Sequence, residues 1–197
     1  MCLMERNMTD TANDESENDS DVIGKLMGYD KWPEEVAIAF DHARGVLSAK
    51  YLKDRKDGRG NFASVLAEFS ALESEYLVRV GDIEENAQQV RRIIAEMIFE
   101  AAWYLDEPFE TCQRYWNEVV QLGFYGVERK ALITGVFVAC CRQHGQTDLG
   151  LANLDPLIAE LERLRAEPAT TKLAAEYYDY TIESLQRARA RLEAERA

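Results

Sequence analysis

Two cysteines and a histidine lie within five residues of one another and are the first candidates for chemistry in this sequence: Cys140, Cys141 and His144. Cys141 and His144 are three residues apart, so on a helix they would share a face and could bind one metal ion. A closed zinc site needs four ligands, and only Cys112 and His42 remain as further donors. We therefore interpret the group as two buried thiols and a polar histidine near a helix end. We expect neither a metal nor another cofactor.

Nucleophilic catalysis has little support in the same region. A catalytic cysteine needs an accessible thiolate beside a base, whereas Cys141 ends the apolar run 135–141 and is predicted to face the core. Carboxylate pairs such as Glu96 and Glu100 are expected by composition alone in a chain with 36 acidic residues. The glycines of the loop 58–60 lack the Lys and Ser/Thr that complete a phosphate-binding loop. We predict no catalytic residue.

The charge of the chain limits its partners. The 197 residues carry a formal net charge of -13, and much of it lies near the start of the chain. Residues 1–24 are rich in acidic and small polar side chains, which predicts a disordered acidic tail, followed by a single all-helical domain over residues 25–197. The negative charge disfavours nucleic acid and anionic membranes and attracts basic proteins. We expect another protein, possibly a basic one, as the partner.

The cysteine content and the apolar runs predict a cytoplasmic protein with reduced thiols. Four cysteines are too few for a disulfide-stapled scaffold of this length. The first 21 residues contain no apolar core of a signal peptide. The longest apolar run, residues 136–141, is far too short to span a membrane.

Apolar side chains recur at steps of three and four residues from Trp32 onward, which predicts an all-α fold of about seven antiparallel helices. Asn61 is a predicted N-cap, and Asp82 with Glu85 resembles a capping box. Pro156 falls inside a helical stretch, where proline commonly causes a kink. The third helix has the broadest apolar face and is expected to be central and buried. The expected helices cover approximately residues 33–55, 61–80, 82–105, 108–122, 127–143, 147–164 and 170–192.

A shift of the sequence by about 38 residues aligns large with large and small with small apolar positions over about 70 residues. In the aligned region Phe109, Cys112 and Trp116 follow an aromatic, small, aromatic order. In this respect the chain resembles tetratricopeptide-repeat-like helical hairpins, which implies stacked hairpins and a protein-binding role. Glu100 and Val138 depart from the repeat, because they stand where it has a small residue. An irregular helical bundle is the alternative architecture.

Protein binding is the leading functional hypothesis, in the form of an adaptor, a chaperone-like scaffold or an inhibitor such as an immunity protein. The alternative is an enzyme without a known motif, whose helical active site is built from carboxylates and one histidine. A third possibility is a subunit of a larger assembly. Because adjacent helical residues point in different directions, one residue of each neighbouring aromatic pair should be exposed. The residues expected to contact the partner are Tyr104, Tyr115, Trp116, Tyr177 and Tyr178.

Overall fold

The computed structural model describes residues 31–58 and 60–196. In this part of the chain all regular secondary structure is helical, which confirms the predicted all-α fold of about seven helices. The acidic tail predicted for residues 1–24 lies outside the described residues. No helix in the described ranges has the length and apolarity needed to cross a bilayer. The helices are α2 (Glu34–Lys56), α3 (Phe62–Arg79), α4 (Glu84–Tyr104), α5 (Phe109–Leu122), α6 (Gly126–Gln143), α7 (Thr147–Arg165) and α8 (Lys172–Arg196).

The starts of α3 and α4 test the two caps predicted from the sequence. The side chain of Asn61 accepts a hydrogen bond from the Ser64 backbone N–H at 3.3 Å, which confirms the predicted N-cap of α3. The capping box predicted from Asp82 and Glu85 is wrong, since α4 starts without a side-chain cap. The carboxylate of Glu85 instead accepts a hydrogen bond from Lys31 Nζ at 2.7 Å, so it is not available to the helix end.

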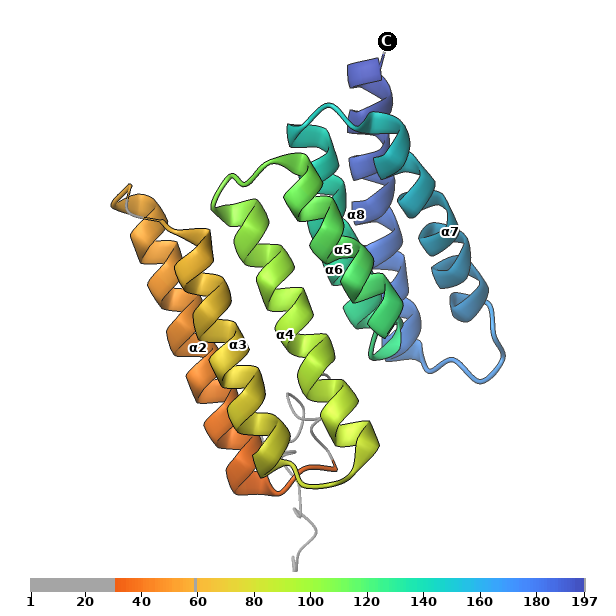
Figure 1. The fold of residues 1–197 in the computed structure, drawn as a ribbon. Helices are drawn as coiled ribbons and strands as arrows, with labels where there is room; N and C mark the ends of the chain where they lie inside the picture. The colour runs from red at the N-terminus through yellow and green to blue at the C-terminus, as the bar shows by residue number, and fades with distance from the viewer. Residues whose placement is uncertain (1–30, 59, 197) are drawn as a thin grey trace, which may run out of the picture.

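The helices form a row of antiparallel hairpins (Figure 1). Each helix packs on the next one in sequence, and α2, α4, α6 and α8 also contact one another in turn. These four helices therefore form one layer, and α3, α5 and α7 form the other. Figure 1 shows the row running from α2 and α3 at one side to α7 and α8 at the other. The more specific resemblance to tetratricopeptide hairpins stays a prediction.

Two hydrophobic clusters fill the row, and α6 contributes to both. In the first cluster, Trp116 of α5 stacks on Phe137 of α6 with ring centroids 4.3 Å apart, and Phe99 of α4 packs 5.7 Å from Trp116. In the second cluster, Val138 of α6 packs with side chains of α7 and α8 such as Leu192. Helix α6 thus joins the two halves of the domain.

Helix α4 is buried along most of its length and packs on α2, α3, α5 and α6, as its broad apolar face predicted. Helix α7, in contrast, continues through Pro156, an exposed position at which the sequence had indicated a possible kink. The proline ring points away from the core, so the helix tolerates it without loss of packing.

Replacing Asn61 with Ala removes the N-cap acceptor and is expected to lower the free energy of unfolding by about 1 kcal/mol. Urea denaturation followed by circular dichroism measures this as a lower midpoint with an unchanged slope. Asn61→Asp keeps an acceptor oxygen and is the matched control. Equal destabilisation by both substitutions would show that the cap is not the cause.

Candidate functional site

Two of the five predicted contact residues are buried. Tyr115 and Trp116 have exposed fractions of 6% and 5%, so the expectation that one of them faces solvent is wrong. The reason is that α5 presents these adjacent residues to different neighbours. Tyr115 packs against Phe62 of α3, with centroids 5.5 Å apart, while Trp116 stacks on Phe137 of α6. Neither ring is available to a partner.

The other three predicted residues lie at two separate places. Tyr104 of α4 is partly buried and has the guanidinium of Arg55 5.7 Å from its ring. Tyr178 of α8 is partly buried, and its hydroxyl donates to Glu128 Oε1 of α6 at 3.4 Å. Tyr177 is 40% exposed, which confirms that one residue of this pair faces solvent. The five residues therefore do not form one surface.

A continuous row of side chains follows one face of α8. Its members are spaced by four, three, four, three and four residues, which keeps them on one side of a helix. Its first half is apolar and well exposed, at 78% for Leu173, 40% for Tyr177 and 69% for Tyr180. Its second half is polar and basic. We call this row the α8 stripe: Leu173, Tyr177, Tyr180, Ser184, Arg187 and Arg191.

A groove of about 280 Å³ lies between α6 and α8, and the second half of the α8 stripe forms one of its walls. Val138 and Leu185 are buried at its floor, with exposed fractions of 3% and 6%. Three arginines line it, although the chain as a whole is strongly acidic. The residues of this α6–α8 groove are Gly135, Val138, Ala139, Arg142, Ser184, Leu185, Arg187, Ala188 and Arg191.

The arginines of the groove are weakly committed to other side chains. Arg142 Nε donates to Glu195 Oε1 at 2.7 Å, and an Arg187 nitrogen lies 3.7 Å from a Glu183 carboxylate oxygen. Both pairs are exposed, and exposed ion pairs contribute little to stability. Arg191 has no side-chain partner within the described part of the chain. An incoming carboxylate can therefore bind these guanidinium groups without breaking a strong interaction.

Gly135 lies inside α6 and opens onto the groove. A Cβ atom built at this position meets no other atom within 4 Å, so close packing does not require a glycine. Its φ is not left-handed either. A glycine inside a helix costs roughly 1 kcal/mol relative to alanine. No contact among the described residues offsets this cost, whereas a glycine in a groove wall leaves space for a bound chain.

A second polar site lies between α2, α4 and α6. Glu96 of α4 is only 2% exposed, and its carboxylate accepts a hydrogen bond from Arg129 Nε of α6 at 2.5 Å. Burial raises the pKa of Glu96 to about 7, against the opposing effect of Arg129. Burial also raises the pKa of Glu100, while Arg129 and Arg44 act against this shift. Composition had given Glu96 and Glu100 no significance, and it did not reveal that Glu96 is buried.

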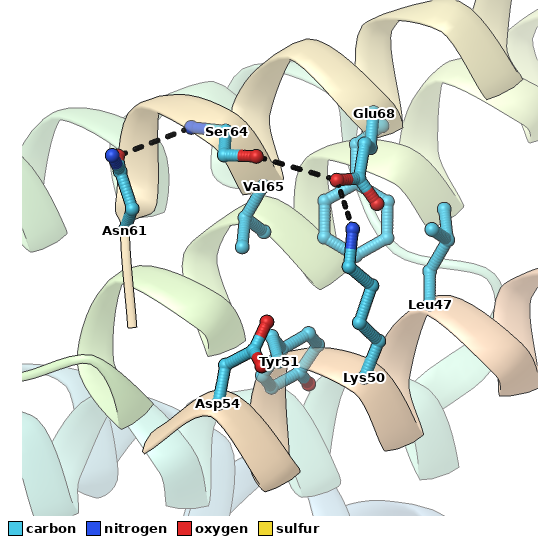
Figure 2. A pocket seen from close by; sticks show the side chains of 9 residues that line it. Leu47, Lys50, Tyr51, Asp54, Asn61, Ser64, Val65 and Glu68 are labelled. Atoms are coloured by element: carbon cyan, nitrogen blue, oxygen red, sulfur yellow. Dashed lines mark hydrogen bonds and ion pairs between the residues drawn. The ribbon is translucent and has the colours of Figure 1, made fainter. Parts of the chain in front are cut away.

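Side chains of α2 and α3 enclose a small pocket. Figure 2 shows Leu47, Lys50, Tyr51 and Asp54 on α2 facing the side chains of α3. The pocket has a volume of about 70 Å³. Burial is the main cause that raises the pKa of Tyr51 to about 12, so its hydroxyl keeps its proton at neutral pH. The pocket volume lies well below the roughly 300 to 1,000 Å³ of typical small-molecule sites.

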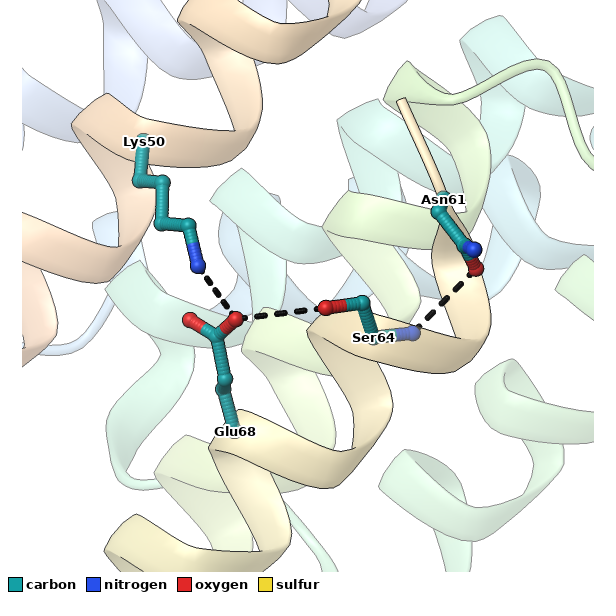
Figure 3. A network of polar contacts seen from close by, with 4 residues as sticks. All are labelled: Lys50, Asn61, Ser64 and Glu68. Carbon is teal, nitrogen blue, oxygen red and sulfur yellow. Dashed lines mark hydrogen bonds and ion pairs between the residues drawn. The ribbon is translucent and has the colours of Figure 1, made fainter. Parts of the chain in front are cut away.

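The rim of this pocket carries a chain of polar contacts (Figure 3). Lys50 pairs with Glu68, whose carboxylate also accepts a hydrogen bond from Ser64 Oγ at 3.3 Å. The backbone N–H of Ser64 in turn donates to Asn61. These contacts link the second half of α2 to the first two turns of α3, and we assign them a structural role.

Cys140 and Cys141 are both buried, as the sequence-based interpretation expected, but Cys141 and His144, the pair weighed as possible metal ligands, are not brought together. The structure instead brings Cys112 of α5 beside Cys140 and His144 of α6. Cys140 and His144 are four residues apart and share a face, whereas the Cβ of Cys141 lies close to Gly150 of α7. The approach of Cys112 depends on the packing of α5 on α6.

The two histidines lie outside the two cavities described above. Neither the α2–α3 pocket nor the α6–α8 groove is lined by His42 or His144. His42 is exposed on α2, and His144 caps the end of α6. Buried acids and a histidine therefore do not meet in either of these two cavities.

Comparison with known proteins adds no family or activity. No protein-family model matches the chain, and neither a curated protein nor a solved structure is similar to it. The proposals below therefore depend on the geometry of this chain alone.

The buried carboxyl of Glu96 predicts a pH dependence of stability. Its folded-state pKa of about 7 exceeds the ordinary value of 4.5, so the folded protein holds this proton more tightly than the unfolded chain does. The resulting stabilisation is complete below the unfolded value and is lost as the pH rises to the folded value. Between about pH 4.5 and pH 7 the free energy of unfolding should fall by up to roughly 3 kcal/mol.

Glu96→Gln should flatten this dependence, as measured by urea denaturation across the same pH range. The raised pKa of Glu100 acts in the same direction, so part of the slope should persist in the variant. Glu34→Gln, at an exposed position on α2, controls for the loss of one negative charge. Identical slopes for the wild type and Glu96→Gln would contradict the assignment.

Proposed function

We propose that this chain is a non-enzymatic scaffold that binds another protein through the α8 stripe and the adjoining α6–α8 groove. The observation that carries the proposal is an exposed row of apolar and basic side chains that leads into a groove with an apolar floor. Exposed leucine and tyrosine side chains that are contiguous along a helix are unusual on a surface that binds nothing. Tyrosine and arginine are also the residues that most often dominate binding energy at protein interfaces.

The spacing of the stripe favours a helix as the bound element. Steps of four and three residues form the seam that one helix presents to another when they pack side by side. Helix α8 packs on α6 and α7, while its stripe is exposed to solvent. An amphipathic helix of the partner can continue the row of helices beyond α8.

Charge complementarity makes the bound segment acidic. Arg142, Arg187 and Arg191 surround the groove, and a guanidinium group binds a carboxylate through two parallel hydrogen bonds. The net charge favours a basic partner for the surface as a whole. We propose that the segment in the groove has the opposite character, with apolar side chains against Leu173 and Tyr180 and acids against the arginines.

Several broader expectations belong to the same proposal. An adaptor, a chaperone-like scaffold and an inhibitor all use a surface of this kind. A cytoplasmic location is consistent with free, buried thiols at Cys112, Cys140 and Cys141. The acidic charge supports a partner that is neither nucleic acid nor a membrane.

The proposal predicts the chemistry of the selected ligands. The purified full chain is panned against a displayed library of peptides drawn from the proteome of its source. The peptides that are enriched should be amphipathic helices with acidic residues towards one end. Replacing Arg187 and Arg191 together with Ser should weaken their binding at least tenfold, or about 1.4 kcal/mol, and should reduce its salt dependence.

Arg114→Ser combined with Arg163→Ser is the matched control, because it removes the same charge from α5 and α7, outside the groove. Equal weakening by both double variants would contradict a local role of the groove. Enrichment of basic peptides would also contradict it. Dimerisation of the wild type that is abolished by Tyr180→Glu would identify a second copy of the chain as the occupant of the stripe, against the proposal.

Gly135 allows stability and binding to be separated. Gly135→Ala should raise the free energy of unfolding by roughly 0.5 to 1 kcal/mol, because it removes a helix-interior glycine without creating a clash. Gly135→Leu should also fold, but it should block the groove and weaken peptide binding. Gly45 of α2 is the control, since a Cβ there also meets nothing within 4 Å. Gly45→Leu should leave binding unchanged, and a loss of binding in that variant would argue against the groove.

A further inference from the structure

Three metal-binding side chains meet where α5 packs on the last turns of α6. Cys112 comes from α5, Cys140 lies in α6, and His144 is the residue that caps the end of α6. Their ligand atoms all lie within 4.8 Å of one another. Both cysteines have an exposed fraction of 0%, while His144 is partly exposed. The two sulfur atoms are therefore shielded from solvent, and only part of the His144 side chain reaches it.

We propose that Cys112, Cys140 and His144 bind one Zn²⁺ ion and leave its fourth coordination position to water or to an external ligand. Two thiolates neutralise the charge of the ion, so a neutral unit is buried rather than an isolated charge. A set of two cysteines and one histidine with an open position is a known arrangement for zinc. Hard cations such as Mg²⁺ and Ca²⁺ prefer oxygen ligands and are disfavoured by this set.

The distances suit this ion. With Zn–S bonds of ~2.3 Å and Zn–N bonds of ~2.0 Å, a tetrahedral site holds its ligand atoms roughly 3.5 to 4 Å apart. In the structure the three ligand atoms lie within 4.8 Å of one another, which is close to this range, so small side-chain rotations bring them into place. Both helices can keep their positions during this adjustment.

The hydrogen bonding of the group also points to a missing partner. His144 Nε2 is buried and has no hydrogen-bond partner within the described structure. A buried nitrogen without a partner is unfavourable, and coordination of an ion would satisfy it. The Cys112 thiol donates a weak hydrogen bond to the Glu107 carbonyl oxygen at 3.7 Å, which it would give up on binding the ion as a thiolate.

A bound ion would stabilise the contact between α5 and α6. Helices α5 and α6 contact each other less extensively than α4 and α5 do. An ion shared by Cys112 on one side and Cys140 with His144 on the other crosslinks the two helices. It also fixes the last turn of α6, because His144 is at the end of that helix.

The test uses the full chain, freed of metal with a chelator and then titrated with Zn²⁺ alone. Mass spectrometry of the metal content should find one Zn²⁺ per chain after dialysis. Co²⁺ in place of Zn²⁺ should give sulfur-to-metal charge-transfer absorption in the near ultraviolet, which requires thiolate ligands. Cys140→Ser and His144→Ala should each weaken zinc binding at least tenfold. Affinity should also fall as the pH falls, because protons compete for the thiolates.

Cys141→Ser is the matched control, since Cys141 is a buried neighbour on the same helix but lies outside the cluster. It should bind zinc as the wild type does. Equal affinities of the wild type, Cys140→Ser and His144→Ala would overturn the proposal, as would a cobalt spectrum without charge-transfer bands. Formation of a Cys112–Cys140 disulfide in the presence of excess zinc would also overturn it. His144 is partly exposed, so His144→Ala keeps the test decisive even where a cysteine variant fails to fold.

Discussion

The burial of α4 is the constraint on which the rest of the structure depends. This helix packs on α2, α3, α5 and α6, yet it carries Glu96 at a position with an exposed fraction of 2%. A buried carboxylate needs either a proton or a cation, and Arg129 near the start of α6 provides the cation. That ion pair limits how α6 can rotate about its axis. In the orientation that the ion pair fixes, Phe137 of α6 stacks on Trp116, and Val138 packs in the second cluster.

Helix α6 consequently has no single apolar face. Phe137 belongs to the first cluster and Val138 to the second, Gly135 opens onto the groove, and Cys140 approaches α5. A helix with contacts in so many directions does not show the one-sided pattern from which a buried face is read. This explains why the sequence led us to weigh Cys141, rather than Cys140, as a possible metal ligand beside His144. By spacing alone, either Cys140 or Cys141 can share a helical face with His144. Only the packing of the neighbouring helices determines which of the two lies beside Cys112.

Sequence reasoning therefore predicted most local features, although the capping box at Asp82 and Glu85 was wrong. Of the tertiary features it predicted the burial of α4 but not the contacts of individual side chains. The seven helices follow from apolar periodicity, and their ends follow from prolines, glycines and the cap at Asn61, all of which act within a few residues. The burial of both Tyr115 and Trp116 could not be predicted, because it requires α5 to lie between α3 and α6. The burial of Glu96 was also not predicted, because the composition of the chain does not distinguish a buried acidic residue from an exposed one. The α8 stripe was detectable from its spacing, but only Tyr177 was selected from it.

The last turn of α6 connects the groove with the cysteine cluster. Arg142 lines the groove and lies between Cys140 and His144 in the sequence, so these residues share about one helical turn. Helix ends are the parts of a helix that open most readily, because their last carbonyl groups have no partner within the helix. Anything that holds Cys140 and His144 against α5 also restrains the backbone of Arg142. An arginine on a restrained backbone loses less conformational entropy when it binds a carboxylate, and so binds it more tightly. The cysteine cluster and the groove, although they face different neighbours, would then be coupled through a single turn of helix.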